Sequence, residues 1–431
     1  MAAQPSPDPI GLQLFPDSRH PPAYQGLDAA AQARVDLGHA VFNTQWVVAG
    51  TPGAARRDGL GPLFNGASCD GCHNEGARGR GPLGDGPAPE AMVVQLALPA
   101  RAGQPELGDP RYGHDLNTAA LPGVAAEGTV SIRYHERTGR YPDGTAWSLR
   151  VPQYLLTDLR YGALSAHTIV KPRLAPALFG DGLLEAVPQS AITGQGSAGQ
   201  APAAPAGAPA WQWQDGGRRL GRFGWQGASI SVREQTGKAF AREMGLTNSV
   251  IGSDDCTAVQ SACRAQPNGG SPEVSDDLFD AVVAFERWLA VPRLPGSDAD
   301  SRAPNTLFVQ IGCAACHRPR LPVMLPRADG SIARAIIAPY TDLRLHDLGA
   351  ELADRDAGGH TVATAWRTAP LWGLGYRVHR EHVPTFLHDG RARTIEEAIL
   401  WHDGKARAAR SAFEQLTAAQ RRALLQWLAM L

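Results

Sequence analysis

The sequence predicts a mainly α-helical fold with long ordered loops and few short strands. Apolar residues recur at helical spacing in six stretches, which are 27–48, 231–244, 277–289, 305–317, 394–402 and 417–430. Strand-like alternation is scarce and short, as in residues 128–134. Stretches rich in Gly and Pro, notably 76–90 and 319–330, are expected to be ordered loops that lie around bound groups.

Length and composition place the chain among folded proteins with more than one core. It has 431 residues, of which 43% are hydrophobic and 19% charged. Its net charge of -1 comes from 41 basic and 42 acidic residues without a long run of either sign, so nucleic acid is not an expected partner. No window reaches the roughly 18 to 20 consecutive apolar residues that a membrane span requires, so none is expected.

Composition breaks divide the chain into two expected modules. Residues 191–210 are rich in Gly, Pro and Ala and are expected to form a flexible insertion. A second break at 291–300 follows an amphipathic helix, which places the module boundary between residues 1–292 and 293–431. An internal repeat supports two modules, because residues 173–182 (RLAPALFGDG) resemble residues 367–375 (RTAPLWGLG).

Each module contains one CxxCH motif. The motifs are Cys69-Asp70-Gly71-Cys72-His73 and Cys313-Ala314-Ala315-Cys316-His317. In such a motif two thiols add to the vinyl groups of a haem while the adjacent His provides the proximal nitrogen to the iron. A zinc ribbon would place its cysteine pairs about 15 to 20 residues apart, and these motifs are much further apart. The sequence therefore predicts two covalently bound c-type haems, with His73 and His317 as iron ligands.

The sixth iron ligands are predicted to differ between the modules. Helices are expected to begin at Ser231 and Thr394, and eight residues further on lie Ala239 and His402. Because only His402 can bind iron, we expect a His317/His402 haem in the second module and an open iron in the first. Other histidines remain alternatives. His346, His382 and His388 compete with His402, whereas His114, His135 or His167 could close the first haem.

The two remaining cysteines are predicted to form a disulfide. Cys256 and Cys263 lie in one polar segment without a CxxC, and two free thiols are the alternative. Haem is attached to CxxCH outside the cytoplasm, where disulfides also form. The opening residues lack the basic start and apolar centre of a secretion signal, so we expect that a signal was removed and that the protein is periplasmic.

Four segments resemble the bacterial di-haem oxidoreductases, a family named for peroxidase or thiol oxidoreductase activity. They are residues 61–73 (GPLFNGASCDGCH), 182–188 (GLLEAVP), 340–349 (YTDLRLHDLG) and 386–402 (FLHDGRARTIEEAILWH). That family is similar to di-haem cytochrome c peroxidases and to the methylamine-utilisation enzyme MauG. In those relatives the helix after the HDG turn carries the distal ligand of the C-terminal haem, a Met or a Tyr, and His402 occupies that place here.

The resemblance also implies catalytic residues and an activity. The relatives have a Trp, a Gln ten residues later and then a catalytic Glu, an order that Trp225, Gln235 and Glu243 follow. Glu243 lies slightly nearer to Gln235 than in the relatives, so Asp277 and Glu185 remain candidates for the acid. A calcium ion between the haems, present in relatives, is possible, although no carboxylate cluster in the sequence marks its site.

The expected reaction is reduction of hydrogen peroxide at the N-terminal haem. The C-terminal haem would transfer and store electrons, and Trp225 would connect the two. Electrons would come from a small c-type cytochrome or copper protein. In the manner of MauG, they could instead come from a protein side chain that becomes oxidised as it gives them up. A di-haem cytochrome that only transfers electrons is the main alternative, and thiol oxidation is a second one.

Overall fold

The computed structural model describes residues 12–14, 27–54, 56–99, 106–194, 207–214, 216–293, 305–326, 331–380 and 383–431. Its helices are α1 Ala29–Phe42, α2 Cys69–Cys72, α3 Asp181–Glu185, α4 Gln189–Thr193, α5 Val232–Glu243, α6 Ser261–Arg264, α7 Asp276–Trp288, α8 Thr306–Gln310, α9 Leu374–Arg380, α10 Ile395–Leu400, α11 Arg407–Glu414 and α12 Ala418–Leu428. Three short 3-10 helices are η1 Asn74–Gly76, η2 Cys313–Ala315 and η3 Gly404–Ala406. The predicted helix over 305–317 is interrupted at Gly312, whose φ of 93° ends the helical backbone before η2.

Strands contain almost as many residues as helices do. They are β1 Leu12–Leu14, β2 Leu63–Phe64, β3 Gly86–Pro87, β4 Met92–Ala97, β5 Ala119–Ala120, β6 Thr129–Arg140, β7 Ala146–Thr157, β8 Ile169–Leu174, β9 Trp211–Gln214, β10 Gly217–Leu220, β11 Val291–Arg293, β12 Leu321–Pro326, β13 Ile332–Ile337, β14 Leu345–Asp347, β15 Asp354–Asp356, β16 Thr361–Ala363 and β17 Ala365–Arg367. Helices account for 28% of the residues and strands for 24%, so the prediction of a mainly α-helical fold is wrong.

The missed strands have sequences that argue against strands. Pro152 lies in β7, Pro172 in β8 and Pro322 in β12, and proline cannot donate a hydrogen bond to a neighbouring strand. Part of the loop predicted at 319–330 is the strand β12, and its last residues, 327–330, lie outside the described residues. The turn between β6 and β7 does carry a signal, because Pro-Asp-Gly at 142–144 is a common turn sequence between two strands.

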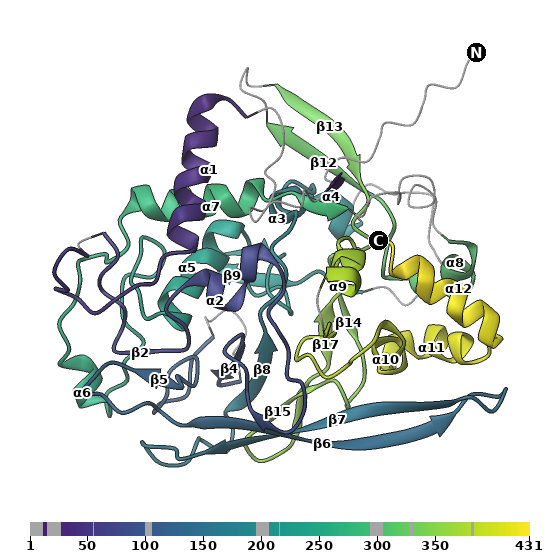
Figure 1. Cartoon of the computed structure of the whole chain (residues 1–431), viewed down its shortest axis with the longest axis horizontal. Helices are drawn as coiled ribbons and strands as arrows, with labels where there is room; N and C mark the ends of the chain where they lie inside the picture. The colour runs from purple at the N-terminus through teal and green to yellow at the C-terminus, as the bar shows by residue number, and fades with distance from the viewer. Residues whose placement is uncertain are drawn as a thin grey trace.

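The two largest sheets join segments from both predicted modules. One has the strand order β16-β15-β8-β4, in which Arg355 of β15 pairs with Val170 of β8. The other has the order β3-β6-β7, and its long hairpin runs beneath α10 and α11 in Figure 1. Tyr141, at the hairpin turn, packs edge to face on Phe413 of α11 with ring centres 6.4 Å apart. The hairpin therefore belongs to the N-terminal sequence but packs on C-terminal helices.

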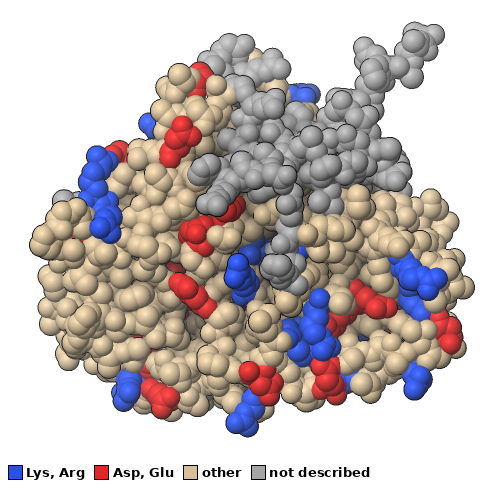
Figure 2. Space-filling view, viewed as in Figure 1, with Lys and Arg blue, Asp and Glu red and all other residues tan. Residues whose placement is uncertain are grey.

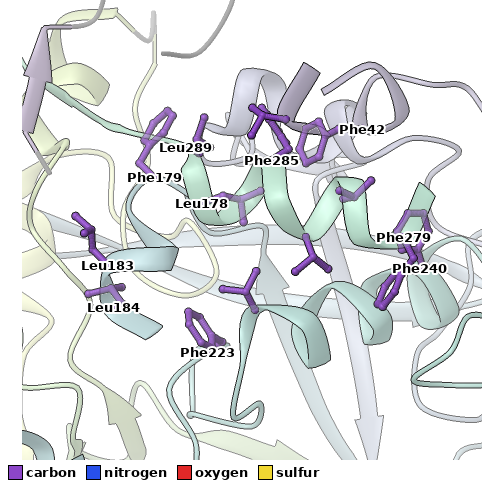
Figure 3. Close-up of a cluster of buried hydrophobic side chains, with 14 of the residues drawn as sticks. Phe42, Leu178, Phe179, Leu183, Leu184, Phe223, Phe240, Phe279, Phe285 and Leu289 are labelled. Atoms are coloured by element: carbon purple, nitrogen blue, oxygen red, sulfur yellow. The ribbon is translucent and has the colours of Figure 1, made fainter. Parts of the chain in front are cut away.

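The larger hydrophobic core lies between α1, α5 and α7. Phe42 and Phe285 face each other across α1 and α7, with ring centres 5.1 Å apart, and Phe240 of α5 packs against Phe279 of α7 (Figure 3). Burying large aromatic side chains is a major source of folding free energy. Cys69 packs against the same core, so α2 is held beside α5 and α7.

The smaller core lies between α8, α10, α11, α12 and the hairpin. Its buried residues include Leu149 of β7, Phe308 of α8, Leu400 of α10 and Leu424 of α12. Cys313 and Ala314 of the second CxxCH motif pack against this core. Each CxxCH motif therefore lies beside its own hydrophobic core. This is the place expected for a haem that completes the core of its module.

Cys256 and Cys263 form a disulfide, as predicted. No helix among the described residues is long and apolar enough to cross a bilayer. On the face drawn in Figure 2, acidic and basic side chains are scattered over the surface, and neither sign gathers into one patch.

A buried ion pair connects the two parts of the four-stranded sheet. Arg173 of β8 donates to both carboxylate oxygens of Asp354 in β15, at 2.8 and 2.6 Å. Both side chains are almost inaccessible, with 6% and 1% exposed. A buried pair of this kind contributes little when intact, but removal of one partner leaves a buried charge uncompensated.

We therefore expect Asp354→Asn to lower the free energy of unfolding by about 3 to 5 kcal/mol in urea denaturation. The matched control is Glu351→Gln, which breaks the exposed pair with Arg137 and should cost less than about 1 kcal/mol. Equal losses in the two variants would show that the buried pair has no special role.

Candidate haem sites and the residues between them

The first CxxCH motif forms the short helix α2 and presents one free imidazole nitrogen. Ser68 caps the helix by accepting from the Gly71 N–H at 3.2 Å. The Nδ1 atom of His73 lies 2.8 Å from the carbonyl oxygen of Pro176. Because a carbonyl can only accept, Nδ1 carries the proton and Nε2 keeps its lone pair for a metal. Burial lowers the pKa of His73 to about 4, so the ring stays neutral.

The second motif repeats this arrangement on η2. The Nδ1 atom of His317 lies 3.0 Å from the carbonyl oxygen of Tyr340, which again leaves Nε2 free. Burial, and after it the neighbouring His402, lower the pKa of His317 to about 4. In both motifs a distant backbone carbonyl therefore fixes the proximal ring in the tautomer that can bind iron.

His402 faces His317 at the separation expected for two ligands of one metal. Their ring centres lie 6.4 Å apart. An imidazole nitrogen lies about 2 Å from its metal and the ring centre about 1 Å behind it, so two rings on opposite sides of one iron have centres about 6 Å apart. The Nδ1 atom of His402 lies 2.7 Å from the Ala398 carbonyl oxygen, so its Nε2 is also free.

The competing histidines of the second module have other partners. His346 is buried, with Nε2 at 2.8 Å from Asp342 and Nδ1 at 3.5 Å from the Cys316 sulfur. His388 stacks on Trp366 with ring centres 3.8 Å apart. His382 lies outside the described residues.

The histidines that could have closed the first site lie elsewhere. His135 and His167 are exposed at the surface. His114 donates from Nδ1 to Asp255 at 2.8 Å. None of the described contacts joins any of these three side chains to His73.

Helix α5 places the predicted residues of the first site on one face. Gln235, Ala239 and Glu243 are four residues apart and therefore project from the same side of the helix, while Phe240 packs into the core. The Glu243 carbonyl accepts from the N–H groups of Asn65 and Gly66, at 2.7 and 3.1 Å, in the loop that leads into α2. The C-terminal end of α5 is therefore fastened to the first CxxCH motif (Figure 1).

The Glu243 carboxyl group is shielded from solvent and lies within electrostatic reach of Cys72. Burial raises its pKa to about 7, against the opposing effects of Asn65 and Arg242. Asn65 Nδ2 donates to it at 3.4 Å. After burial, Glu243 is the main reason why the pKa of Cys72 is raised to about 12, which shows that the two side chains are close. A carboxyl group with a pKa near neutrality is suited to moving protons.

The alternative acids have structural partners. Glu185 accepts from the Val232 N–H at the start of α5 and pairs with Arg287 at 2.6 Å. Asp277 is exposed and pairs with Arg56 at 2.8 Å. A hydrogen bond from Ser275 is the main cause that lowers the pKa of Asp277, so it is ionised at neutral pH. Glu243, in contrast, lies beside the loop that leads into the first motif, and burial raises its pKa.

The segments before α5 and α10 are structural repeats. Phe223 bridges to Ser229 before α5, and Phe386 bridges to Ala392 before α10. Ser231 and Thr394 then cap the two helices by accepting from Glu234 and Glu397 N–H groups at 3.1 and 3.0 Å. The local backbone structure therefore agrees with the repeat up to the two caps. Beyond them it differs, because Ala239 lies inside α5 whereas His402 lies two residues past the end of α10.

Trp225 lies between the two motifs in a chain of hydrogen bonds. Its indole N–H donates to the Leu174 carbonyl at 2.9 Å, two residues before the Pro176 carbonyl that holds His73. Its own carbonyl accepts from the Arg367 N–H at 2.9 Å. It therefore contacts both halves of the molecule.

The series of hydrogen bonds continues from Arg367 to the second motif. The next residue, Thr368, accepts from the Thr341 hydroxyl at 2.6 Å, and the residue before Thr341 is Tyr340, which holds His317. Covalent and hydrogen bonds thus run without a gap from one proximal histidine to the other, through Trp225. The resemblance to the relatives pointed to Trp225 but gave no indication of its partners.

Two polar residues near Glu243 were not predicted, the half-buried Asn65 and the buried Asp115. Asn65 links the Glu243 carboxylate to Thr118, whose N–H donates to the Asn65 side chain at 3.1 Å. Asp115 is completely buried and lies within electrostatic reach of Glu243. No sequence pattern marks either residue, because their surroundings come from distant segments. Among the described residues, no cluster of three or more His, Cys, Asp or Glu side chains forms a metal site that could hold the expected calcium.

The donors at both motifs fit a haem iron, since each neutral imidazole is buried, oriented by a carbonyl and flanked by two cysteines. Comparison with known proteins agrees. No curated protein and no solved structure is significantly similar to the chain. The family model described as "Di-haem oxidoreductase, putative peroxidase" matches residues 117–431, well over half of the chain. The protein therefore belongs to the di-haem oxidoreductase family.

Proposed function

We propose that this protein is a c-type di-haem peroxidase that reduces hydrogen peroxide at the site of the N-terminal motif. One observation carries the proposal. Eight residues after the cap of each repeated segment, the first segment has Ala239, inside α5, and the second has His402, two residues past the end of α10. A methyl group cannot bind iron and leaves room for a small ligand, whereas an imidazole fills the sixth position.

The residues proposed to hold the haems are those of the two motifs. Cys69 and Cys72 would form thioether bonds at the first site, and Cys313 and Cys316 at the second. His73 would be the protein ligand of the first iron, and His317 and His402 those of the second. When bound, the N-terminal haem supplies the centre for peroxide reduction and the C-terminal haem supplies a store for electrons.

Glu243 is proposed to move a proton between the two oxygen atoms of peroxide. With a pKa of about 7, its carboxylate can accept the proton of one oxygen and, as the acid, donate it to the other oxygen, which leaves as water. Asn65 steadies the carboxylate through its hydrogen bond to Oε2. The burial that raises the pKa of Glu243 makes both protonation states accessible near neutral pH.

Gln235 is proposed to orient peroxide and Trp225 to connect the two sites. Gln235 projects from the same face of α5 as Glu243, and its amide can donate to or accept from peroxide. The hydrogen-bonded path through Trp225 supports its role in electron transfer between the motifs. The hydrogen bond from the indole N–H to the Leu174 carbonyl also fixes the orientation of the Trp225 ring.

Electrons are proposed to come from a small c-type cytochrome or copper protein, or from a protein side chain that is oxidised. The periplasm is the proposed location. The disulfide between Cys256 and Cys263 supports it, because disulfides persist in oxidising compartments. A chain that only transfers electrons would need ligands on both sides of both irons, and no such second ligand is apparent among the described contacts of His73.

We expect His402→Ala to convert one low-spin haem to high spin while both haems remain covalently attached. The substitution removes only the distal nitrogen, and attachment depends on the cysteines. Optical absorption and resonance Raman spectra of the oxidised protein provide the measurement. His346→Gln is the matched control and should keep the spectrum of the unsubstituted protein. If His402→Ala retained its low-spin haem, His402 would not be the ligand.

We expect Glu243→Gln to slow the reaction with hydrogen peroxide by about 10² or more, the usual effect of losing a positioned proton carrier. In the unsubstituted protein the rate should rise with pH through about 7, as the Glu243 carboxylate ionises, and the variant should lose this dependence. Stopped-flow mixing with peroxide measures both. Asp277→Asn is the control and should react normally. A normal rate for Glu243→Gln would reject its assignment.

A further inference from the structure

Asp115 is a buried carboxyl group with no hydrogen-bond partner. Its side chain has 0% exposure. Within the part of the chain that the structure describes, neither of its carboxyl oxygens accepts or donates a hydrogen bond, and the nearby Asn117 Oδ1 also lacks a partner. An ionised carboxylate without a partner is far more costly to bury than a neutral carboxyl group. The geometry alone therefore favours the protonated form of Asp115.

The surroundings of Asp115 agree with this conclusion. The charged groups that face it are Glu243, Arg242, Asp255 and Glu106. Burial is the main cause that raises the pKa of Asp115 well above its usual range, and Glu243 is the next largest. Asp255 and Glu106 raise it further, and Arg242 opposes them. Because two negative charges in one buried region repel each other, the Glu243 carboxylate favours the protonated form of Asp115.

The chain segment that carries Asp115 is fastened to Glu243. The Thr118 N–H and hydroxyl both donate to the Asn65 side-chain oxygen, at 3.1 and 3.3 Å. The Asn65 amide donates in turn to Glu243 Oε2 at 3.4 Å. Asn117 is held by Glu127, which accepts from its backbone N–H at 2.5 Å. The segment of Asp115 is thus linked to the Glu243 carboxylate through Thr118 and Asn65, and it is fixed separately by the bond between Asn117 and Glu127.

We propose that Asp115 stores a proton that reloads Glu243 during turnover. The inference rests on the proposed peroxidase function. Reduction of one H2O2 to two H2O takes up two electrons from the donor and two protons. Glu243 can pass on the proton that peroxide already carries, but the two additional protons must enter from elsewhere. Asp115 holds one of them beside Glu243, out of contact with solvent, and is refilled later. In this proposal Asp115 acts only through Glu243 and does not touch peroxide itself.

The protonation of Asp115 can be tested without peroxide, by thermal unfolding of the holoprotein. Because the folded pKa is raised, only the unfolded state ionises as the pH rises above about 4, and the fold loses stability in that direction. Asparagine imitates the protonated form and avoids this loss. We expect the Tm of Asp115→Asn to match that of the unsubstituted protein at pH 4 and to exceed it at pH 8 by about 2 °C or more.

Asp354→Asn is the matched control, since its carboxylate is also buried. Burial alone would raise the pKa of Asp354, but the Arg173 guanidinium outweighs burial and holds it below its usual range. Its Tm should therefore fall at pH 8. A fall of Tm at pH 8 for Asp115→Asn as well would mean that Asp115 is ionised, for example by holding a cation, and would overturn the proposal.

The relay itself is tested by turnover with hydrogen peroxide and a one-electron dye donor. In Asp115→Asn the first reaction with peroxide, measured in a single mixing, should stay within about twofold, because Glu243 is intact. Steady-state turnover should fall about tenfold or more at pH 8 and recover toward pH 6, where bulk protons are plentiful. Glu243→Gln should lose both activities at both pH values.

These outcomes separate the two proposals. Unchanged turnover of Asp115→Asn at pH 8 would overturn the relay while leaving the peroxidase function intact. An unsubstituted protein that shows no turnover with peroxide would contradict the peroxidase function, and with it the relay. The Tm comparison would still report whether Asp115 is protonated.

Discussion

The hydrogen bond from each proximal histidine to a backbone carbonyl is the contact on which the rest of the arrangement depends. Pro176 and Tyr340 come from segments far from the CxxCH motifs, and each fixes the neutral tautomer of its histidine. The same two segments lead to Trp225, through Leu174 on one side and Thr341 on the other. The contacts that orient the two rings thus also join the two sites.

The two sites are built from one pattern that differs at the position that matters most. A seven-residue loop closed by an antiparallel bridge precedes both α5 and α10, and a hydroxyl side chain caps each helix. The backbones correspond through the loop and the cap and differ afterwards, because α5 continues through Ala239 to Glu243 whereas α10 ends at Leu400, two residues before His402. In the proposed assignment, this difference gives the first site an open face and the second site a second ligand.

Much of the candidate site could be predicted from the sequence, and part of the fold could not. CxxCH motifs, helix caps and repeat spacing are local patterns, so His73, His317 and α5 were found by inspection. Strand pairing is not local. Val170 of β8 pairs with Arg355 of β15, far away in the sequence, and β8 also contains Pro172, so its sequence does not resemble a strand. Asp115 was missed for a related reason, because its importance comes from burial and not from any motif.

The central claim is that the two irons differ in coordination, one open and one closed. A low-temperature electron paramagnetic resonance spectrum of the oxidised protein tests it most directly. The account predicts one high-spin and one low-spin ferric haem in equal amounts, because it assigns a histidine on both sides to the second iron and on one side to the first. Two low-spin signals and no high-spin signal would contradict it, since they would require a ligand opposite His73 and would make the protein an electron carrier.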